Sequence, residues 1–344
     1  MKLNKPFFIA EISANHCGSL KIAKKLIDDA KKYGADAVKL QTYTPDTMTL
    51  NIKKKKFLIN NGLWKGKKLW DLYNIAQTPY EWHKILFSYA RKKKIECFST
   101  PFDESAVDFL EKLNCPYYKV SSFEMTDIPL IKKIAKTKKK MIISTGMANI
   151  NEIKKTYDVA KKNGAKEIIL LYCVSNYPSK LSDFNLNNIK IMKKKFKCIV
   201  GLSDHSKNNL VAKLAVAVGA KVFEKHIALK RYNKSPDYDF SIKGEEIRKY
   251  REDLNLSFQL LGKKKFFRTK SELANKKFRR SIYVVKDIKK GEKFSKINLK
   301  KIRPGYGLDP LYYESILKKR AYKNFYKGSP LNRKDLQKLK LKRF

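Results

Sequence analysis

The stretch FFIAEISANHCGSLKIAKKLIDDAKKYGADAVKLQ, residues 7–41, contains one complete structural unit. Its first apolar run, Phe7–Ile12, predicts a strand, and a second apolar run ends the stretch. The segment between them has helical periodicity, with apolar residues at three- and four-residue spacing: Leu20, Ala23, Leu26, Ile27 and Ala30. Gly34 ends this helix, because glycine readily adopts the backbone conformation that terminates helices. Residues 7–41 therefore predict a strand–helix–strand unit of a parallel sheet.

The same pattern repeats as far as residue 262, and a helix–Gly–Ala–strand ending recurs at Gly164 and Gly219. The predicted strands are Phe7–Ile12, Ala37–Gln41, Glu96–Ser99, Tyr117–Val120, Met141–Ser144, Ile168–Cys173, Cys198–Leu202 and Val222–His226. Eight β/α units in one region predict a (β/α)8 TIM barrel, a member of the α/β class. A doubly wound open sheet is the alternative, because its units have the same local pattern.

The composition changes after residue 262, which predicts a second, smaller domain. Residues 263–280, KKKFFRTKSELANKKFRR, are highly charged and lack a sustained apolar stripe, so we interpret them as a linker. Residues 281–344 then contain two short strand-like runs, Ser281–Val285 and Leu299–Ile302, among turn signals such as Lys290-Gly291. We expect a catalytic barrel over residues 1–262 and a loop-rich module over 281–344.

The formal charge of +46 would suggest nucleic-acid binding if its basic residues were concentrated in one place. Of the 78 basic residues, 11 are Arg and 67 are Lys, and the lysine runs are spread along the whole chain. Arginine is the preferred residue for bidentate recognition of phosphates and bases. The pattern therefore favours a lysine-rich solvated surface that attracts small anions, with no specific nucleic-acid partner.

Cysteine usage and hydropathy indicate the compartment. The five cysteines occur singly, without a CxxC pair, which is typical of reduced thiols and argues against disulfides or a zinc–thiolate site. No run approaches the roughly 20 apolar residues that a membrane-spanning helix needs. The start of the chain also lacks the pattern of a signal peptide. We expect a soluble, cytoplasmic protein with no membrane partner.

Polar side chains follow most of the predicted strands, where the active site of a barrel lies. They are Glu11, Asn15, His16, Lys39, Gln41, Ser99, Thr100, Lys119, Ser121, Ser122, Glu124, Ser144, Thr145, Ser175, Asn176, Ser203, Asp204, His205, Glu224, Lys225 and His226. Two lysines with several hydroxyl groups and a glycine-containing turn would form a cradle for a phosphate. Any single Ser or Thr here could instead be a helix N-cap. The prediction of a phosphate site therefore depends on polar residues occurring after most of the eight strands.

Two of the four histidines, His205 and His226, end consecutive strands. Adjacent barrel positions would bring both imidazoles onto one divalent cation, although hydrogen-bonded core histidines have the same spacing. His83 lies inside a helical segment and is interpreted as structural. Glu11 lies in an apolar run, where burial would raise its pKa and suit it to proton transfer. Its alternative is a carboxylate paired with a lysine such as Lys39.

Taken together, the motifs resemble the sialic acid synthase family. The similar segments, in order, are FIAEISANHCGS (8–19), GADAVKLQTYTPDTMT (34–49), FSTPFD (98–103), YYKVSSFEM (117–125), ISTGMA (143–148), GLSDHS (201–206) and FEKHIAL (223–229). The tail segment GEKFSKINLKKIRPGYGL (291–308) resembles the SAF, or antifreeze-like, domain. The segments AEISANH and KLQTYTPDTMT are most similar to the branch of this family that makes pseudaminic acid.

The resemblance implies an enzyme that joins phosphoenolpyruvate to an amino sugar, in a homodimer whose SAF domains cap the partners' barrels. His205 and His226 would bind a divalent metal ion, Mn²⁺, Mg²⁺ or Co²⁺. The phosphoenolpyruvate-binding residues would be Lys39, Thr100, Lys119, Ser122, Ser144, Ser175 and Ser203. The sugar-binding residues would be Gln41, Glu124, Asp237 and, from the partner subunit, the Arg303 position. Glu11 would be the acid/base residue, so Glu11, His205 and His226 form the expected catalytic set.

Two positions depart from the family pattern, and two alternatives for the function stay open. Cys17 replaces the usual second Asn of the NHNG motif, which predicts a small local change. Ser175-Asn176 replaces a different polar arrangement, so the phosphate contact there is uncertain by one residue. The close alternative is a sialic or legionaminic acid synthase. The alternative from another class is a non-catalytic protein that binds carbohydrate or polyanions.

Overall fold

The computed structural model describes residues 3–60, 62–263 and 265–341 of the 344-residue chain. It divides into two compact units, Met1–Gly262 and Lys263–Phe344. None of the helices in the described parts of the chain is long and apolar enough to cross a membrane.

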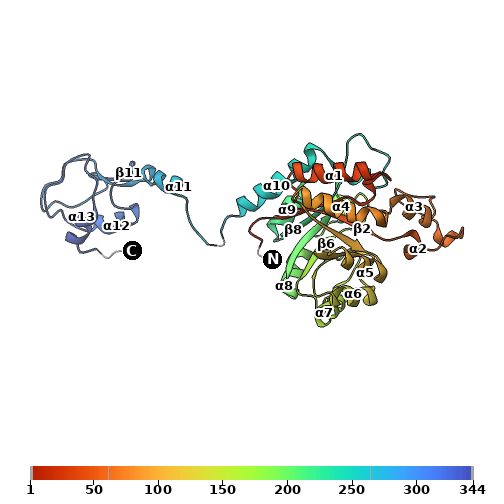
Figure 1. Cartoon of the computed structure of the whole chain (residues 1–344). Coiled ribbons are helices and arrows are strands. Elements are labelled where there is room, and N and C mark those ends of the chain that lie inside the picture. Colours follow the sequence, from red (N-terminus) through yellow and green to blue (C-terminus); the bar gives the residue numbers. More distant parts are fainter. Residues whose placement is uncertain (1–2, 61, 264, 342–344) are drawn as a thin grey trace. The chain divides into compact units, whose positions relative to one another are not determined.

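The first unit is a closed parallel barrel (Figure 1). Its strands are β1 Phe7–Glu11, β2 Ala37–Thr42, β3 Glu96–Pro101, β4 Tyr117–Val120, β5 Lys140–Ser144, β6 Ile168–Cys173, β7 Ile199–Asp204 and β8 Val222–Ala228. Each strand pairs with the next, and β8 pairs with β1 from Phe7↔Val222 to Glu11↔His226. This last pairing closes the sheet, so the predicted TIM barrel is confirmed and the open-sheet alternative is wrong. A short strand, β9 Ile242–Lys243, extends the sheet beside β8.

Helices lie outside the strands, as Figure 1 shows. They are α1 Leu20–Lys32, α4 Tyr80–Lys92, α5 Glu104–Lys112, α6 Ile128–Lys136, α7 Ile150–Lys162, α8 Asn187–Phe196, α9 Leu210–Ala217 and α10 Glu245–Leu261. Short helices α2 Pro45–Met48 and α3 Leu69–Ala76 lie in the connection after β2. The 3-10 turns of this unit are η1 Ser13–His16, η2 Lys55–Phe57, η3 Leu181–Asp183 and η4 Tyr238–Phe240.

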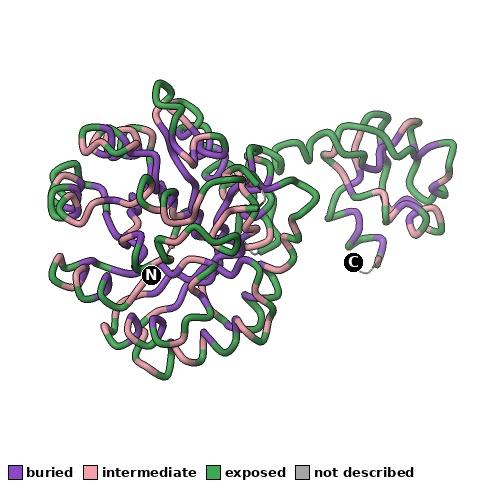
Figure 2. The backbone as a smooth tube through the Cα atoms, turned by 90° about the vertical axis from the view of Figure 1, so that its right-hand side faces the viewer, coloured by how far each residue is buried: buried purple, intermediate pink, exposed green. Residues whose placement is uncertain are grey.

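The core lies between the strands and the inner faces of the helices, where Figure 2 shows buried backbone surrounded by exposed turns. Helix α1 illustrates the cause, since Ile22, Ala23, Leu26, Ile27 and Ala30 are its buried residues. Strand β8 is buried along its entire length, as expected for a strand with the barrel interior on one side and helices on the other. Side chains alternate between these two environments, so the residues that reach the interior are spaced by two.

The second unit contains a small antiparallel pair, β10 Ser281–Val284 and β11 Leu299–Ile302, joined from Ser281↔Ile302 to Val284↔Leu299. Its helices are α11 Lys270–Ala274, α12 Tyr313–Leu317 and α13 Arg333–Lys338, with turns η5 Asn275–Phe278 and η6 Pro310–Tyr312. A separate core includes Ile282, Phe294, Leu299, Ile316 and Phe325. The predicted linker, 263–280, therefore includes a short helix and a turn, and residue 264 lies outside the described residues.

Candidate active site

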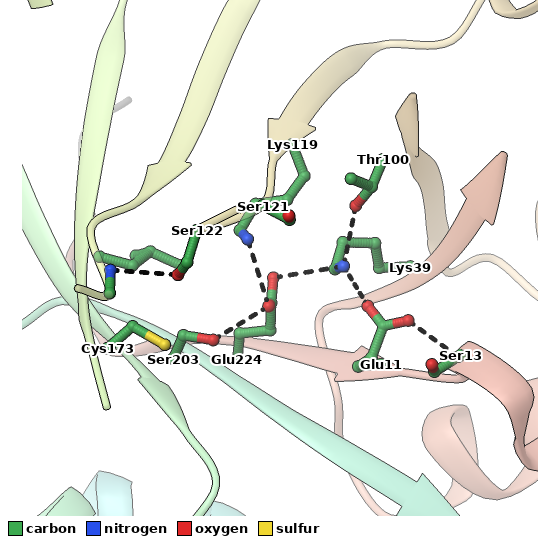
Figure 3. Close-up of polar contacts among 12 residues, drawn as sticks. Glu11, Ser13, Lys39, Thr100, Lys119, Ser121, Ser122, Cys173, Ser203 and Glu224 are labelled. Carbon is green, nitrogen blue, oxygen red and sulfur yellow. Dashed lines mark hydrogen bonds and ion pairs between the residues drawn. The ribbon is translucent and has the colours of Figure 1, made fainter. Parts of the chain in front are cut away.

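Four buried charged side chains meet inside the barrel, as Figure 3 shows. Lys39 on β2 forms an ion pair with Glu11 on β1 and lies 3.8 Å from Glu224 on β8. Lys119 on β4 lies 3.5 Å from the other carboxylate oxygen of Glu224. Each of the four is at most 4% exposed, so their charges compensate one another in place of water.

Hydroxyl groups from the same strand ends complete this cluster. Lys39 donates a hydrogen bond to Thr100 Oγ1 at 2.9 Å, and Ser203 donates to Glu224 Oε1 at 3.2 Å. Ser144 is buried at the end of β5, and its Oγ has no hydrogen-bond partner among the described residues. An unpartnered buried hydroxyl is a free donor for an anionic ligand.

The two buried glutamates differ in their ionisation. Burial raises the pKa of Glu11 from its ordinary 4.5 to about 7, although the neighbouring Lys39 opposes this rise. Burial also opposes ionisation of Glu224, but Lys119 and Lys39 together lower its pKa below the ordinary value. Two carboxyl groups with separated pKa values suit different roles, one moving a proton and one staying ionised. Its pKa makes Glu11 the better suited of the two to moving a proton.

Gly146, after β5, allows the turns of three strands to meet. Its amide donates to Ser122 Oγ at 3.1 Å. A Cβ added at Gly146 would lie 2.1 Å from Ser175 Oγ and 2.8 Å from Ser122 Oγ, so only glycine leaves room for both hydroxyls. Asn176 instead donates to Asp183 on an exposed segment. Of the Ser175-Asn176 pair, Ser175 is therefore the residue that lies beside Gly146 and Ser122.

The two histidines of the predicted metal pair lie side by side, with ring centroids 5.5 Å apart. His205 follows β7 and donates from Nδ1 to the Val174 carbonyl at 3.1 Å. The Nδ1 atom of His226 lies 3.6 Å from Asp237 Oδ2. Burial and the neighbouring His205 hold the pKa of His226 well below its ordinary value, so this imidazole is neutral at physiological pH.

This arrangement fits a divalent cation. Histidines that bind metals commonly use one nitrogen for the metal and direct the other at a carbonyl or carboxylate, as His205 Nδ1 does here. His226 Nδ1 makes no hydrogen bond among the described residues but lies near the Asp237 carboxylate. Both Nε2 atoms then remain available as ligands. Among the described residues, no group of three or more His, Cys, Asp and Glu is arranged to hold a metal, so water or substrate would complete the coordination.

The residues predicted to bind the sugar lie in different places. Gln41 donates from Nε2 to Ser13 Oγ at 2.9 Å, at the carboxyl end of β2. Glu124 is hydrogen-bonded by Ser121, and burial raises its pKa to about 7. Asp237 Oδ2 lies 3.6 Å from His226 Nδ1 and accepts a hydrogen bond from the Ala14 amide of η1 at 3.5 Å. Asp237 is therefore a neighbour of the histidine pair as well as a predicted sugar ligand. Arg303 is exposed directly after β11 in the second unit.

Two neighbours of this site were not assigned a role from the sequence. Glu224 could have been found, because it lies two residues before His226 on one strand and so reaches the same side of the sheet. Tyr177 packs on the His205 ring, with centroids 4.3 Å apart, and no local pattern marks it. The structural interpretation of His83 is confirmed: its ring nitrogens contact Thr42 Oγ1 at 2.8 Å and the Pro79 carbonyl at 3.1 Å.

Solved structures with the same architecture include sialic acid synthases. The chain is 30% identical to N-acetylneuraminic acid synthetase from Leptospira borgpetersenii, with a TM-score of 0.71, covering 79% of this chain and 90% of that one. A putative spore coat polysaccharide biosynthesis protein E from Chromobacterium violaceum has a TM-score of 0.75 at 24% identity and covers 96% and 99% of the two chains. The second similarity concerns the fold alone.

The NeuB family model matches residues 26–266, and the SAF domain model matches residues 279–337. The chain therefore belongs to the NeuB family, and the predicted resemblance is confirmed. It is 44% identical over 333 residues to a pseudaminic acid synthase from Campylobacter jejuni, covering 97% of each chain. It is also 40% identical over 336 residues to a pseudaminic acid synthase from Helicobacter pylori, covering 97% of this chain and 99% of that one.

The unusual Cys17 yields a prediction about stability. Cys17 has φ 50° and ψ 39°, a left-handed conformation that Asn tolerates better than other non-glycine residues. Replacing Cys17 with Asn should therefore raise the free energy of unfolding by about 1 kcal/mol, measured by urea denaturation. Cys17→Val is the control and should lower it, because β-branched residues are strongly disfavoured there. A lower midpoint for Cys17→Asn would show that the thiol contact with the Asn15 carbonyl, at 3.5 Å, matters more than backbone strain.

Proposed function

We propose that this chain is a pseudaminic acid synthase that condenses phosphoenolpyruvate with 2,4-diacetamido-2,4,6-trideoxy-L-altrose. The observation that carries the proposal is the buried cluster of Lys39, Lys119 and Glu224 beside a histidine pair. The similarity to two pseudaminic acid synthases at 44% and 40% identity supports the choice of sugar. The five unpaired cysteines support a cytoplasmic location, where thiols stay reduced.

The phosphoenolpyruvate would bind in the cluster around Lys39 and Lys119. Its phosphate and carboxylate carry several negative charges, which the two ammonium groups and the Lys-rich surface attract. Thr100, Ser122, Ser144, Ser175 and Ser203 would supply the hydroxyl donors. Glu224 would compensate the charges of both lysines before the substrate arrives, because it lies within 3.8 Å of both Nζ atoms.

The reaction joins C3 of phosphoenolpyruvate to the aldehyde carbon of the open-chain sugar. Water then adds to C2, and the C–O bond to phosphate breaks, giving the nonulosonic acid and inorganic phosphate. Glu11 would take the proton from this water, which its pKa of about 7 makes feasible near neutral pH. Lys39 and Lys119 would stabilise the negative charge on the departing phosphate.

His205 and His226 would hold the divalent cation, Mn²⁺, Mg²⁺ or Co²⁺. When bound, such a cation supplies Lewis-acid polarisation of a carbonyl oxygen. Asp237 and the Val174 carbonyl would orient the two imidazoles for this task. Gln41 and Glu124 would contact the sugar near the mouth.

Phosphate release tests this proposal. Purified protein would be incubated with phosphoenolpyruvate, Mn²⁺ and one of three sugars: the altrose sugar, 2,4-diacetamido-2,4,6-trideoxy-mannose or N-acetylmannosamine. We expect release with the altrose sugar and its loss with a chelator. Preference for a mannose-configured sugar would reassign the chain to a legionaminic or sialic acid synthase. No release with any sugar would favour a non-catalytic protein that binds carbohydrate or polyanions.

Glu11 yields a prediction about pH dependence. Because the ionised form accepts the proton, the kcat/KM of the wild type for phosphoenolpyruvate, which reports the free enzyme, should rise as pH increases through about 7. Glu11→Gln should lose this rise and lower kcat by about 10²–10⁴-fold. The Kd for phosphoenolpyruvate, measured by calorimetry, should change much less.

Glu124→Gln is the matched control, because burial also raises the pKa of Glu124 to about 7. At saturating sugar this variant should keep the rise in kcat/KM for phosphoenolpyruvate with pH. Equal losses of turnover and phosphoenolpyruvate affinity in Glu11→Gln would mean that Glu11 only maintains the ion pair with Lys39.

We also propose a homodimer in which each SAF domain completes the partner's site. Large apolar residues are exposed near the end of the barrel and in the segment after it, among them Leu260 at 77% and Phe266 at 84%. Such exposure is typical of a surface that another protein covers. A second copy would cover it and would bring the Arg303 position to the sugar.

Mixed dimers test this arrangement. His226→Ala and Arg303→Ala should each be nearly inactive alone. Coexpressed, they should regain about a quarter of wild-type activity, because half of randomly formed dimers would contain one intact site. Failure to regain activity, with dimers present by ultracentrifugation, would mean that each chain uses its own Arg303.

A further inference from the structure

A hairpin in the connection after β2 extends from the barrel, and we call its described residues, 58–60 and 62–68, the Trp64 hairpin. Leu58 and Lys68 form an antiparallel bridge at its base. The Ile59 amide donates to the Lys67 carbonyl at 2.9 Å, and the Gly66 amide donates to the Ile59 carbonyl at 2.8 Å. Trp64 lies in the turn, so its side chain is held at the end of a hydrogen-bonded support.

Trp64 contacts the connections that follow two other strands. Its indole Nε1 donates to the Pro236 carbonyl at 3.1 Å, in the segment after β8. Its ring packs against Tyr177, in the segment after β6, with centroids 5.8 Å apart. The side chain is half-buried, so part of its face remains accessible. One residue therefore joins three connections at the carboxyl ends of the strands.

The two residues that Trp64 contacts, Tyr177 and Pro236, each adjoin a residue of the candidate active site. The Tyr177 ring packs on His205 at 4.3 Å and on Phe240 at 5.3 Å. Pro236 directly precedes Asp237, whose carboxylate lies 3.6 Å from His226. Trp64 thus contacts two neighbours of the histidine pair: Tyr177, and the segment that carries Asp237.

We propose that Trp64 forms the outer wall of the sugar subsite and favours sugars with apolar substituents; this inference rests on the proposed function. The proposed substrate carries a C6 methyl group and two acetamido methyl groups. A tryptophan whose N–H is already bonded presents a fixed apolar face to such groups. The hairpin also limits access of bulk water to the aldehyde. Only the water from which Glu11 takes the proton needs to reach the reacting carbons.

The test compares Trp64→Ala and Trp64→Phe with Trp70→Phe. Trp70 is the matched control because its Nε1 donates at 2.8 Å to Asp46, within the same connection and away from the histidines. Trp64→Ala should raise the KM for the altrose sugar about tenfold or more, the usual effect of losing an apolar contact. The KM for phosphoenolpyruvate should stay nearly unchanged. The preference in kcat/KM for the altrose sugar over N-acetylmannosamine should fall, because N-acetylmannosamine has a hydroxymethyl group at that end.

Tryptophan fluorescence gives a second readout that a purely structural role would not affect. The chain has three tryptophans, so the emission change on adding sugar in the presence of phosphoenolpyruvate can be assigned by single substitutions. This change should disappear in Trp64→Phe and persist in Trp70→Phe. Trp64→Phe should keep most of the apolar contact and show a smaller rise in KM than Trp64→Ala.

The outcomes separate this inference from the proposed function. If the wild type releases no phosphate with any sugar, the proposed function fails and the inference fails with it. If the wild type is active but Trp64→Ala leaves the sugar KM, the sugar preference and the emission change intact, the inference alone is overturned. A parallel rise in both KM values with a lower melting temperature would also overturn it, because Trp64 would then only stabilise the fold.

Discussion

The ion pairs among Lys39, Glu11, Lys119 and Glu224 are the interaction on which the rest of the site depends. Four charges in a barrel interior are tolerable only when each faces an opposite charge, because water is not there to solvate them. The sheet register provides this pairing, since Glu11 lies opposite Lys39 and closure of β1 on β8 brings Glu224 into reach. The closed barrel is therefore required by the site as well as by the core.

This balance also explains how a cationic protein can bind an anion without losing the fold. Lys39 and Lys119 are not free cations in the resting protein, because Glu224 lies between them. An arriving phosphate would compete with carboxylates for the same ammonium groups.

Around this charged centre, the hydroxyl groups and the histidines come from different strands of the barrel. The hydroxyls near Gly146 come from the turns after β4 and β6, and Gly146 itself follows β5. The histidines come from β7 and β8, with Asp237 and Tyr177 beside them. Cys173 at the end of β6 connects the two groups, because its Sγ lies 3.7 Å from Ser175 Oγ and 3.8 Å from His205 Nδ1.

The sequence by itself determined the eight strands, because their apolar runs and the periodicity of the intervening helices are local properties. It also determined which side chains end those strands, and so most of the site. Only the tertiary structure decided which groups pair, for example that Glu224 lies between Lys39 and Lys119 and that Ser175 rather than Asn176 reaches Gly146. The bond between Trp64 and Pro236 joins residues 172 positions apart. Such a contact depends on how the barrel closes and how the connections pack, which no local pattern in the chain encodes.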